Sequence, residues 1–526
     1  MKTLHRSLVI GCSMLALAGC GGDEIVSPGT GGNITINNST STPAPTPTPT
    51  PTSTLVTPAN GCPTISDPQG LTDEGTITGP TGEYRICTLP ARFNTSSTLP
   101  QISGLLYRMA GRVDVGTDGG PTPDASDGFS DTDVTLTIEP GVIIYASGSS
   151  FLMVNRGNQI NAVGTAAKPI IFTSRDNVLG LNNDSSSGQW GGVVLGGRAP
   201  VTDCSAPGAT PGTINCERQV EGAAQPALFG GATNNDSSGR MEYVQIRYSG
   251  FVLSGDNELQ SLTTGGTGTG TVLNHIMSYN SSDDGVEFFG GFVNVKHLIV
   301  VGAEDDGLDT DTGVKANMQY VVVIQRPGAG DTIIEADSSN AAIDNTPRQN
   351  TQISNATFVH QNPAASQAIR IRGGADYTLT NTVVSAPNST CLRIDDAETL
   401  RAANAGLDDV GPVVFQSVVL ACNDPFRSGS NGVSEQNVTD AFNAGTNNNS
   451  AYTATLTNLF INGANEDALT AFNASTLITS PSSFFDNAGF VGAVRSSDTW
   501  QQGWTCDSST VAFGSNTGSC ASLPVF

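Results

Sequence analysis

Two acidic clusters of nearly matching sequence, DDGVE at 283–287 and DDGLD at 305–309, lie 22 residues apart in a chain of which only 13% is charged. Grouped carboxylates can hold a hard cation such as calcium, which prefers oxygen ligands. Two carboxylates at a suitable separation can also hydrolyse a glycosidic bond. Both chemistries require residues that are distant in sequence to meet in space. The secondary structure that carries the clusters therefore determines which of the two chemistries is available.

The clusters belong to a longer series of repeated short segments. The first kind of segment reads EYVQI at 242, NHIMS at 274, KHLIV at 296, QYVVV at 319, NATFV at 355, NTVVS at 381, QSVVL at 416 and NLFIN at 458. A second kind follows several of these, reading VEFFG at 286, LDTDT at 308, IEADS at 334, IRIRG at 369 and LRIDD at 392. Gly, Asn and Asp turns separate them, and the spacing is 22 or 23 residues where no loop is inserted.

Short strands at this spacing cannot bury a face alone and gain a core only by stacking. The pattern therefore predicts an all-β chain forming a parallel β-helix, right-handed because crossovers between parallel strands are, with loop insertions and small N- and C-terminal caps. We expect the helix over 134–480, an N-terminal cap region over 62–133 and a C-terminal cap with a local disulfide over 481–526.

Stacked coils would place equivalent residues about 4.8 Å apart in columns. Because strand residues alternate between faces, the aliphatic residues that open the second kind of segment should point inward: Val286, Leu308, Ile334, Ile369 and Leu392. Two outward columns should then follow, one of Glu287, Asp309, Glu335, Arg370 and Arg393, the other of Phe289, Asp311, Asp337, Arg372 and Asp395.

Like charges at this spacing repel by roughly 1 kcal/mol even in water, so something must offset them. One solution is calcium, with ligands among Asp284, Glu287, Asp306, Asp309, Asp311, Glu335 and Asp337, and with Asp283 and Asp305 nearby. The other is ion pairing between coils, Glu335 with Arg370 and Asp337 with Arg372. Both remedies stay open at this point.

A resemblance covers nearly all of the chain after the N-terminal region. It rests on YRMAGRVDVGTDG, LTIEPGVIIYASG, KPIIFTS, GQWGGVVLGGRAPV, DDGVEFFGGFVNVKHLIVV and GFVGAVRSSDTWQQGW. Together these resemble a group of bacterial surface and secreted proteins that is similar to the parallel β-helix proteins of the pectate-lyase-like superfamily. The resemblance implies the fold and no particular reaction, since fold alone does not supply one.

Three functions remain open for the acidic face. As an enzyme it would be a calcium-dependent polysaccharide lyase or a glycoside hydrolase acting on an acidic polysaccharide, with catalytic candidates Glu287, Asp309, Asp311, Glu335, Arg370 and Arg372. As a binding protein, which we favour, it would hold an extended glycan or a surface partner. As a structural or adhesive protein it would bind calcium only to hold the coils together.

Aromatic and polar residues near this face allow two interpretations. Phe289, Tyr248 and Tyr279 would give sugar rings a stacking surface, or they stack on each other between coils. His275 and His297 hold equivalent positions and continue with Tyr243 and Tyr320, which favours ring stacking over a zinc site. We expect a structural amide ladder of Asn274, Asn355, Asn381 and Asn458 with Gln319 and Gln416. Asp124, Asp127, Asp131 and Asp133 form a solvated insertion or a calcium loop, and we favour the insertion.

The eight cysteines after Cys20 fall into neighbours along the chain. Although eight cysteines allow 105 connectivities, local pairs suit a loop-rich protein that folds in an oxidising compartment. We expect the disulfides Cys62–Cys87, Cys204–Cys216, Cys391–Cys422 and Cys506–Cys520.

The N-terminus predicts export and a lipid anchor. A basic start and about eleven mostly apolar residues, too few to span a bilayer, precede Leu17-Ala18-Gly19-Cys20, which looks like a bacterial lipoprotein signal. We therefore expect a signal peptide over 1–19 and lipidated Cys20 with a Thr/Pro-rich tether over 20–61. The expected location is the outer membrane, with Cys20 in its lipid and the body exposed at the cell surface, or alternatively facing the periplasm.

Charge excludes several partners. The chain carries a net charge of −25, and removal of Lys2 and Arg6 with the signal leaves 21 basic against 48 acidic residues. Such a surface repels nucleic acid and anionic lipid. No Walker sequence is present, so the sequence predicts neither nucleic-acid nor nucleotide binding.

Overall fold

The computed structural model describes residues 55–526, apart from 222, 224–225, 255–256, 340–341, 480–482 and 516. The signal segment, Cys20 and most of the tether lie outside these residues. Residues 55–526 form one compact unit. None of the helices in the described part is long and apolar enough to cross a bilayer.

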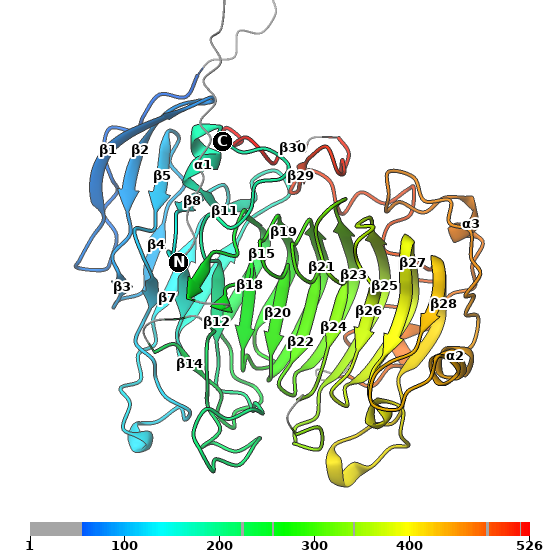
Figure 1. Cartoon of the computed structure of the whole chain (residues 1–526). Helices are drawn as coiled ribbons and strands as arrows, with labels where there is room; N and C mark the ends of the chain where they lie inside the picture. The colour runs from blue at the N-terminus through cyan, green and yellow to red at the C-terminus, as the bar shows by residue number, and fades with distance from the viewer. Residues whose placement is uncertain are drawn as a thin grey trace, which may run out of the picture. The chain divides into compact units, whose positions relative to one another are not determined.

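A sheet of 24 strands dominates this unit, and its strands pair in parallel except where β1 meets β2. In the first coils each strand pairs with the third one along, as β2 with β5, β3 with β6 and β4 with β7, so that three series of strands stack. In the later coils β19 pairs with β21, β21 with β23, β23 with β25 and β25 with β27, while β20 pairs with β22, β22 with β24 and β24 with β26. Each later coil thus contributes a longer and a shorter strand, which stack in two series (Figure 1). The predicted parallel β-helix is confirmed.

After β1 and β2, the strands of the first coils are short, and the longest strands of this sheet lie in the last coils. The first coils contain β1 (Thr72–Gly79), β2 (Gly82–Thr88), β3 (Arg92–Phe93), β4 (Ser97–Leu99), β5 (Leu105–Arg108), β6 (Val113–Val115), β7 (Thr135–Ile138), β8 (Ile143–Ala146), β9 (Leu152–Val154), β10 (Gln159–Val163), β11 (Ile170–Ser174) and β12 (Val193–Gly196). The later coils contain β15 (Gly239–Arg247), β18 (Leu262–Gly265), β19 (Val272–Tyr279), β20 (Val286–Phe289), β21 (Phe292–Val301), β22 (Leu308–Asp311), β23 (Lys315–Gln325), β24 (Ile334–Ala336), β25 (Asn350–His360), β26 (Gln367–Ile371), β27 (Asp376–Ile394) and β28 (Val414–Arg427).

Smaller elements lie in the insertions and the C-terminal segment. They are the strand pairs β13 (Arg218–Gln219) with β14 (Leu228–Phe229), β16 (Val252–Ser254) with β17 (Asn257–Glu258), and β29 (Cys506–Asp507) with β30 (Gly518–Ser519), and the helices α1 (Arg175–Leu179), α2 (Glu435–Asn443) and α3 (Ala464–Asp467).

The core is the stack of inward side chains that alternation predicts. The five aliphatic residues of the second strand series are each at most 1% exposed and belong to the main hydrophobic cluster: Val286, Leu308, Ile334, Ile369 and Leu392. Burying such a side chain contributes roughly 1.5–3 kcal/mol. This stack fixes the register of the strands, and with it the columns on the outer wall.

The two ends of the helix are closed differently. Parallel pairing already begins between β2 and β5, within the stretch expected as an N-terminal cap. At the other end Phe442 of α2 packs on Phe415 and Phe426 of β28, with ring centroids 5.5 and 5.3 Å apart. These contacts cover the last coil with an apolar lid.

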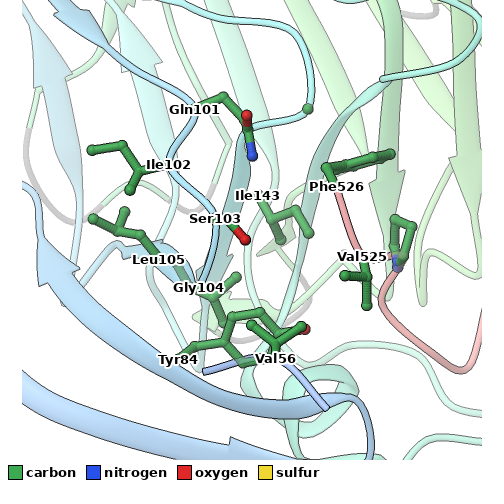
Figure 2. Close-up of a pocket in the computed structure, with 13 residues that line it drawn as sticks. Val56, Tyr84, Gln101, Ile102, Ser103, Gly104, Leu105, Ile143, Val525 and Phe526 are labelled. Carbon is green, nitrogen blue, oxygen red and sulfur yellow. The ribbon is translucent and has the colours of Figure 1, made fainter. Parts of the chain in front are cut away.

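The C-terminal segment, expected as a cap, instead runs back along the flank of the coils. Trp504 and Phe513 belong to one cluster with Met277 and Ile299 of the central strands. Figure 2 shows Val525 and Phe526 beside Val56, Tyr84 and Ile143 of the first coils. The segment therefore joins the two ends of the solenoid.

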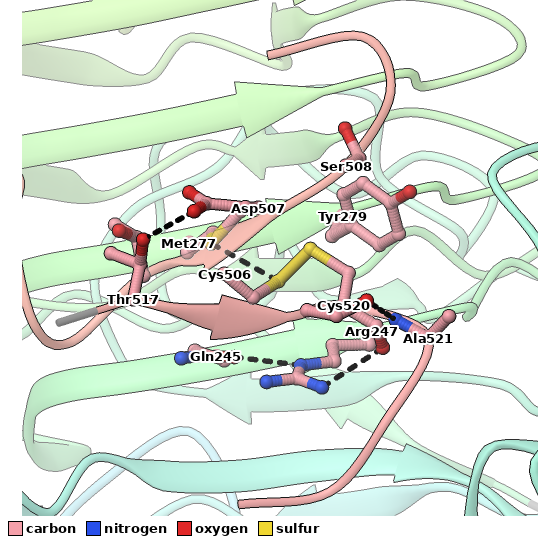
Figure 3. Close-up of a disulfide and its surroundings, with 12 residues drawn as sticks. Gln245, Arg247, Met277, Tyr279, Cys506, Asp507, Ser508, Thr517, Cys520 and Ala521 are labelled. Atoms are coloured by element: carbon pink, nitrogen blue, oxygen red, sulfur yellow. Dashed lines mark hydrogen bonds between the residues drawn. A yellow bond between two sulfur atoms is a disulfide. The ribbon is translucent and has the colours of Figure 1, made fainter. Parts of the chain in front are cut away.

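All four predicted disulfides are present: Cys62–Cys87, Cys204–Cys216, Cys391–Cys422 and Cys506–Cys520. The last one holds β29 beside β30 against Met277 and Tyr279 (Figure 3). Beneath it the Arg247 guanidinium donates hydrogen bonds to the carbonyl oxygens of Cys520 and Ser522, both at 3.0 Å.

The ring column is confirmed, and the amide ladder is present only in part, since the Gln319 amide donates to Asn355 Oδ1 at 3.0 Å but the register differs from the expected one. Tyr243, His275, His297 and Tyr320 stack in sequence with centroids 4.2, 4.1 and 5.0 Å apart. The register pairs Gln319 with Ser354, so Asn355 and Asn381 lie one position further along, in the ring column.

The ring column has a backbone conformation that explains this shift. Its members all have positive φ: Tyr243, His275, His297, Tyr320, Asn355 and Asn381. Asparagine tolerates this left-handed region better than most residues, which accounts for the two asparagines there. Asn458 is outside the coils, and its amide donates to the Ala512 carbonyl.

Candidate cation and ligand site

The two acidic clusters lie one above the other on a single outer wall. Glu287 of β20 is paired with Asp309 of β22, and Asp309 with Glu335 of β24. The column continues from Glu335 to Arg370 and from Arg370 to Arg393. The first predicted column is therefore confirmed. Glu287 and Asp309, which are 22 residues apart in the sequence, lie opposite each other on neighbouring strands.

An aspartate in the turn before each strand accepts a hydrogen bond from the corresponding turn of the next coil. The Asp306 amide donates to Asp284 Oδ1 at 2.8 Å, and the Thr332 amide donates to Asp306 Oδ1 at 2.8 Å. The glycines of the two DDG motifs are required by packing, since a Cβ at Gly285 or Gly307 would overlap a valine side chain beneath it. One oxygen of each turn aspartate is thus structural.

Three carboxylates meet where the turn joins the strand. Oxygens of Asp284, Glu287 and Asp309 all lie within 4.8 Å of one another. Two further groups meet the same limit, Asp283 with Asp284 and Asp305, and Asp305 with Asp306 and Asp331.

Asp331 is the one member of these groups that sequence reasoning missed. Its amide donates to the Asp305 carbonyl at 2.9 Å, so it occupies the position of Asp305 in the next coil. Counting back from Glu335 in that register would have found it.

Glu287 and Asp309 have no hydrogen bond or ion pair within the part of the chain that the structure describes, although Glu287 is only 7% exposed. Both face an open hollow of about 430 Å³, which Glu221 of an insertion also lines. Burial, followed by the charge of Asp309, raises the pKa of Glu287 well above its usual value. Burial, followed by the charge of Asp311, does the same to the pKa of Asp309.

Asp284 completes the same site. Burial, followed by the charges of Asp283 and Glu287, raises the pKa of Asp284 well above its usual value. The pKa of Asp306 is raised mainly by burial and by Glu335. These shifts describe a place where negative charge is costly unless a cation or a proton is present.

The insertion between β12 and β15 covers Phe289, the first residue of the other outward column. Arg218 lies 5.2 Å from the Phe289 ring centroid, and its guanidinium pairs with Asp203 at 3.4 Å and Glu221 at 3.3 Å. Phe229 packs on Phe289 with centroids 6.0 Å apart. Phe289 therefore lies on the outer wall, as expected, but the insertion covers its side chain.

The three aromatic residues considered as a stacking surface for sugars, Phe289, Tyr248 and Tyr279, are not exposed. Phe289 is 2% exposed, Tyr248 is fully buried and Tyr279 is 1% exposed. The two tyrosines form an edge-on pair with centroids 5.4 Å apart. The alternative interpretation, that these aromatics pack on each other, is confirmed for Tyr248 and Tyr279, whereas Phe289 packs on the insertion.

In the coils that follow Asp309, arginines pair with the carboxylates of this wall. Arg370 contacts Glu335 at 3.5 Å and Asp395 at 2.8 Å, and Arg372 contacts Asp337 at 3.4 Å and also Glu335. Both predicted pairs between coils are present. Burial alone would lower the pKa of Arg370, but the hydrogen bond to Asp395 and the charges of Glu335 and Asp395 raise it.

Asp311 lies between the two parts of the wall. Its pKa is raised by burial and then by the charge of Asp337. Ion pairing, one of the two remedies that the sequence left open, is therefore present for Glu335 and Asp337. Among the described residues no arginine contacts Glu287 or Asp309.

The acidic insertion at 124–133 has a different character. Asp127 accepts from Thr122 and Phe129, Asp124 accepts from the Ser126 amide, and Asp131 pairs with Arg198. These carboxylates are engaged by the loop and its neighbour, which favours the solvated insertion.

The fold and this wall define a parallel β-helix protein with an acidic hollow on one outer face. The family described as a pectate-lyase-like beta helix domain matches residues 127–505, and the chain belongs to that family. Neither a curated protein nor a solved structure matches the chain.

Proposed function

We propose that this chain is a cell-surface binding protein in which Asp284, Glu287 and Asp309 hold a calcium ion, with an extended glycan or a surface partner as the ligand. The single observation that carries the proposal is the pair Glu287 and Asp309, opposed on neighbouring strands and without a hydrogen-bond or ion-pair partner among the described residues.

The geometry fits calcium. Two oxygens at about 2.4 Å from a shared calcium ion are at most about 4.8 Å apart, the limit that the three carboxylates meet. Two unit charges 4 Å apart interact by about 4 kcal/mol near a protein surface. A dication at their centre turns this repulsion into attraction, and calcium accepts six to eight oxygens.

The hydrolase and lyase alternatives have less support. Arg370 and Arg372, the candidate base or charge stabiliser of a lyase, are both held by carboxylates. The distance test for a carboxylate pair is met by any acidic wall of stacked strands, since neighbouring strands lie about 4.8 Å apart. A binding site needs none of these groups to be free.

The anchor supports a place at the cell surface. Acylation of Cys20 in the L-A-G-C box would tether the body to the outer membrane, and the Thr/Pro-rich segment after it favours an extended backbone. Labelling of cells with a radioactive fatty acid should mark the wild-type chain and not Cys20→Ala. Equal labelling of the two would contradict the anchor.

Calorimetric titration of the purified full chain with calcium tests the site. We expect Glu287→Gln and Asp309→Asn each to weaken calcium binding at least tenfold. Glu335→Gln is the matched control, because the same column places this acid beside two arginines, and it should change the dissociation constant less than threefold. Absence of calcium binding by the wild type, or equal effects of all three variants, would overturn the proposal.

A further inference from the structure

We propose that the ligand of this site is a neutral glycan, held by two vicinal hydroxyl groups that coordinate the cation in place of water. This inference rests on the proposed calcium site and adds the chemical class of its ligand. The predicted ligand class differs from the acidic polysaccharides that the lyase alternative requires, so binding experiments can distinguish the two.

Charge around the hollow favours a neutral ligand. Seven acidic residues line it and no lysine or arginine does among the described lining residues: Glu221, Asp283, Asp284, Glu287, Glu304, Asp305 and Asp309. Two of the lining acids, Glu221 and Glu304, are paired with arginines from outside the lining, Arg218 and Arg326. A calcium ion offsets two of the negative charges, so a uronate or sulfate group would still meet a surplus of like charge.

Hydrogen bonding points the same way. The polar side chains of the lining that are not carboxylates already donate elsewhere: the Ser282 hydroxyl to the Gly250 carbonyl, and the Gln260 amide to Asp283 at 3.3 Å. What the hollow offers to a ligand is therefore mainly carboxylate acceptors. The ligand must bring the donors, which carboxylate and sulfate groups lack.

A sugar hydroxyl meets both demands. Its oxygen can coordinate the cation while its proton is donated to a carboxylate beside it. Three protein carboxylates that each bind through one oxygen leave at least three of the six to eight positions of calcium open. A hollow of about 430 Å³ lies within the range of small-ligand sites, about 300–1,000 Å³.

The buried aromatics make hydroxyl coordination the main source of selectivity. Phe289, Tyr248 and Tyr279 are covered, so they offer no face on which a sugar ring could stack. Selection would then depend on the arrangement of hydroxyl groups, and any glycan without adjacent free hydroxyls would be a poor ligand.

The test compares three polymers on the calcium-loaded full chain: mannan, mannan whose vicinal diols have been cleaved with periodate and reduced, and polygalacturonate. Calorimetry or biolayer interferometry would give each affinity. We expect mannan to bind, oxidised mannan to bind at least tenfold more weakly, and EDTA or Asp309→Asn to abolish binding, with Glu335→Gln close to wild type.

The possible failures are distinguishable. If calcium itself does not bind, the proposed function fails. If calcium binds and polygalacturonate is bound in preference, or oxidised mannan binds as well as mannan, or no polymer binds, the calcium site stands and the neutral-glycan inference is overturned.

Discussion

Glu287 and Asp309 are directly opposed on β20 and β22, and their carboxylates come within 4.8 Å of each other at the edge of an open hollow. One coil further on, Glu335 occupies the same column but contacts Arg370 and Arg372. Within three successive strands the column thus holds two acids without an ion-pair partner among the described residues, Glu287 and Asp309, and one acid paired with arginine, Glu335. The effect of a substitution in this column should therefore depend on its position.

The raised pKa values of Glu287 and Asp309 predict that the cation-free protein loses stability as pH rises. A carboxyl group with a folded pKa above its unfolded value near 4 favours folding while protonated, and this contribution is lost as pH rises through the folded pKa. In EDTA, the melting temperature should therefore fall as pH rises above the unfolded value near 4 toward the raised pKa values, and calcium should remove the fall. The double variant Glu287→Gln/Asp309→Asn should show a smaller fall in EDTA. A melting temperature that rises over this range in EDTA would contradict the prediction.

The histidines of the ring column predict an opposite effect in acid. Burial lowers the pKa of His275 to about 4, and burial followed by the charge of His275 lowers that of His297 to about 3. Since the unfolded value is near 6.5, the stability they contribute is complete above pH 6.5 and is lost as pH falls toward 4. Each contributes a slope of at most about 1.4 kcal/mol per pH unit.

Asparagine provides the matched replacement, because Asn355 and Asn381 occupy the same column with the same positive φ. His275→Asn/His297→Asn should be less stable at pH 7, through loss of ring packing, yet show a shallower decline between pH 6.5 and 4. Chemical denaturation at several pH values measures both. An unchanged slope would mean that these histidines do not titrate on unfolding.

Arg247 is predicted to hold the C-terminal segment against the coils. Burial lowers its pKa to about 10, and it donates to Gln245 at 2.7 Å as well as to the Cys520 and Ser522 carbonyls. Arg247→Gln should cost about 2–4 kcal/mol, since hydrogen bonds from charged groups contribute about 1.5–3 kcal/mol each. Urea denaturation would measure this loss of stability, and limited proteolysis of residues 506–526 would detect release of the segment. Arg240→Gln is the control on the same strand, because that side chain is 54% exposed, and it should change stability by less than about 0.5 kcal/mol.

The Cys506–Cys520 disulfide should stabilise the same segment independently. It closes a separation of 14 residues, for which loop-closure entropy predicts about 3 kcal/mol. Cys506→Ala/Cys520→Ala should therefore unfold at lower urea and expose the segment to protease. Cys204→Ala/Cys216→Ala, which removes a bridge of similar span from the insertion, should leave protease resistance of the segment unchanged. Equal sensitivity of both variants would show that the disulfide has no local role.

The sequence by itself determined the coil and the register of its second strand series. Inward residues such as Val286 and Leu308 recur at the period of the coil, and strand alternation then places Glu287 over Asp309 without further information. The reason is physical: parallel strands of fixed spacing leave one register that buries the aliphatic stack. The cysteine pairs followed for a similar reason, since each joins neighbouring parts of the chain.

Tertiary structure decided what surrounds the columns. The insertion that carries Arg218 covers Phe289 and shapes the hollow, and the C-terminal segment lies along the flank rather than over the end. The path of such segments depends on contacts between residues far apart in the chain, which no periodic pattern records. Only these contacts could show that Glu335 has arginine partners while Glu287 and Asp309 face the hollow with none among the described residues.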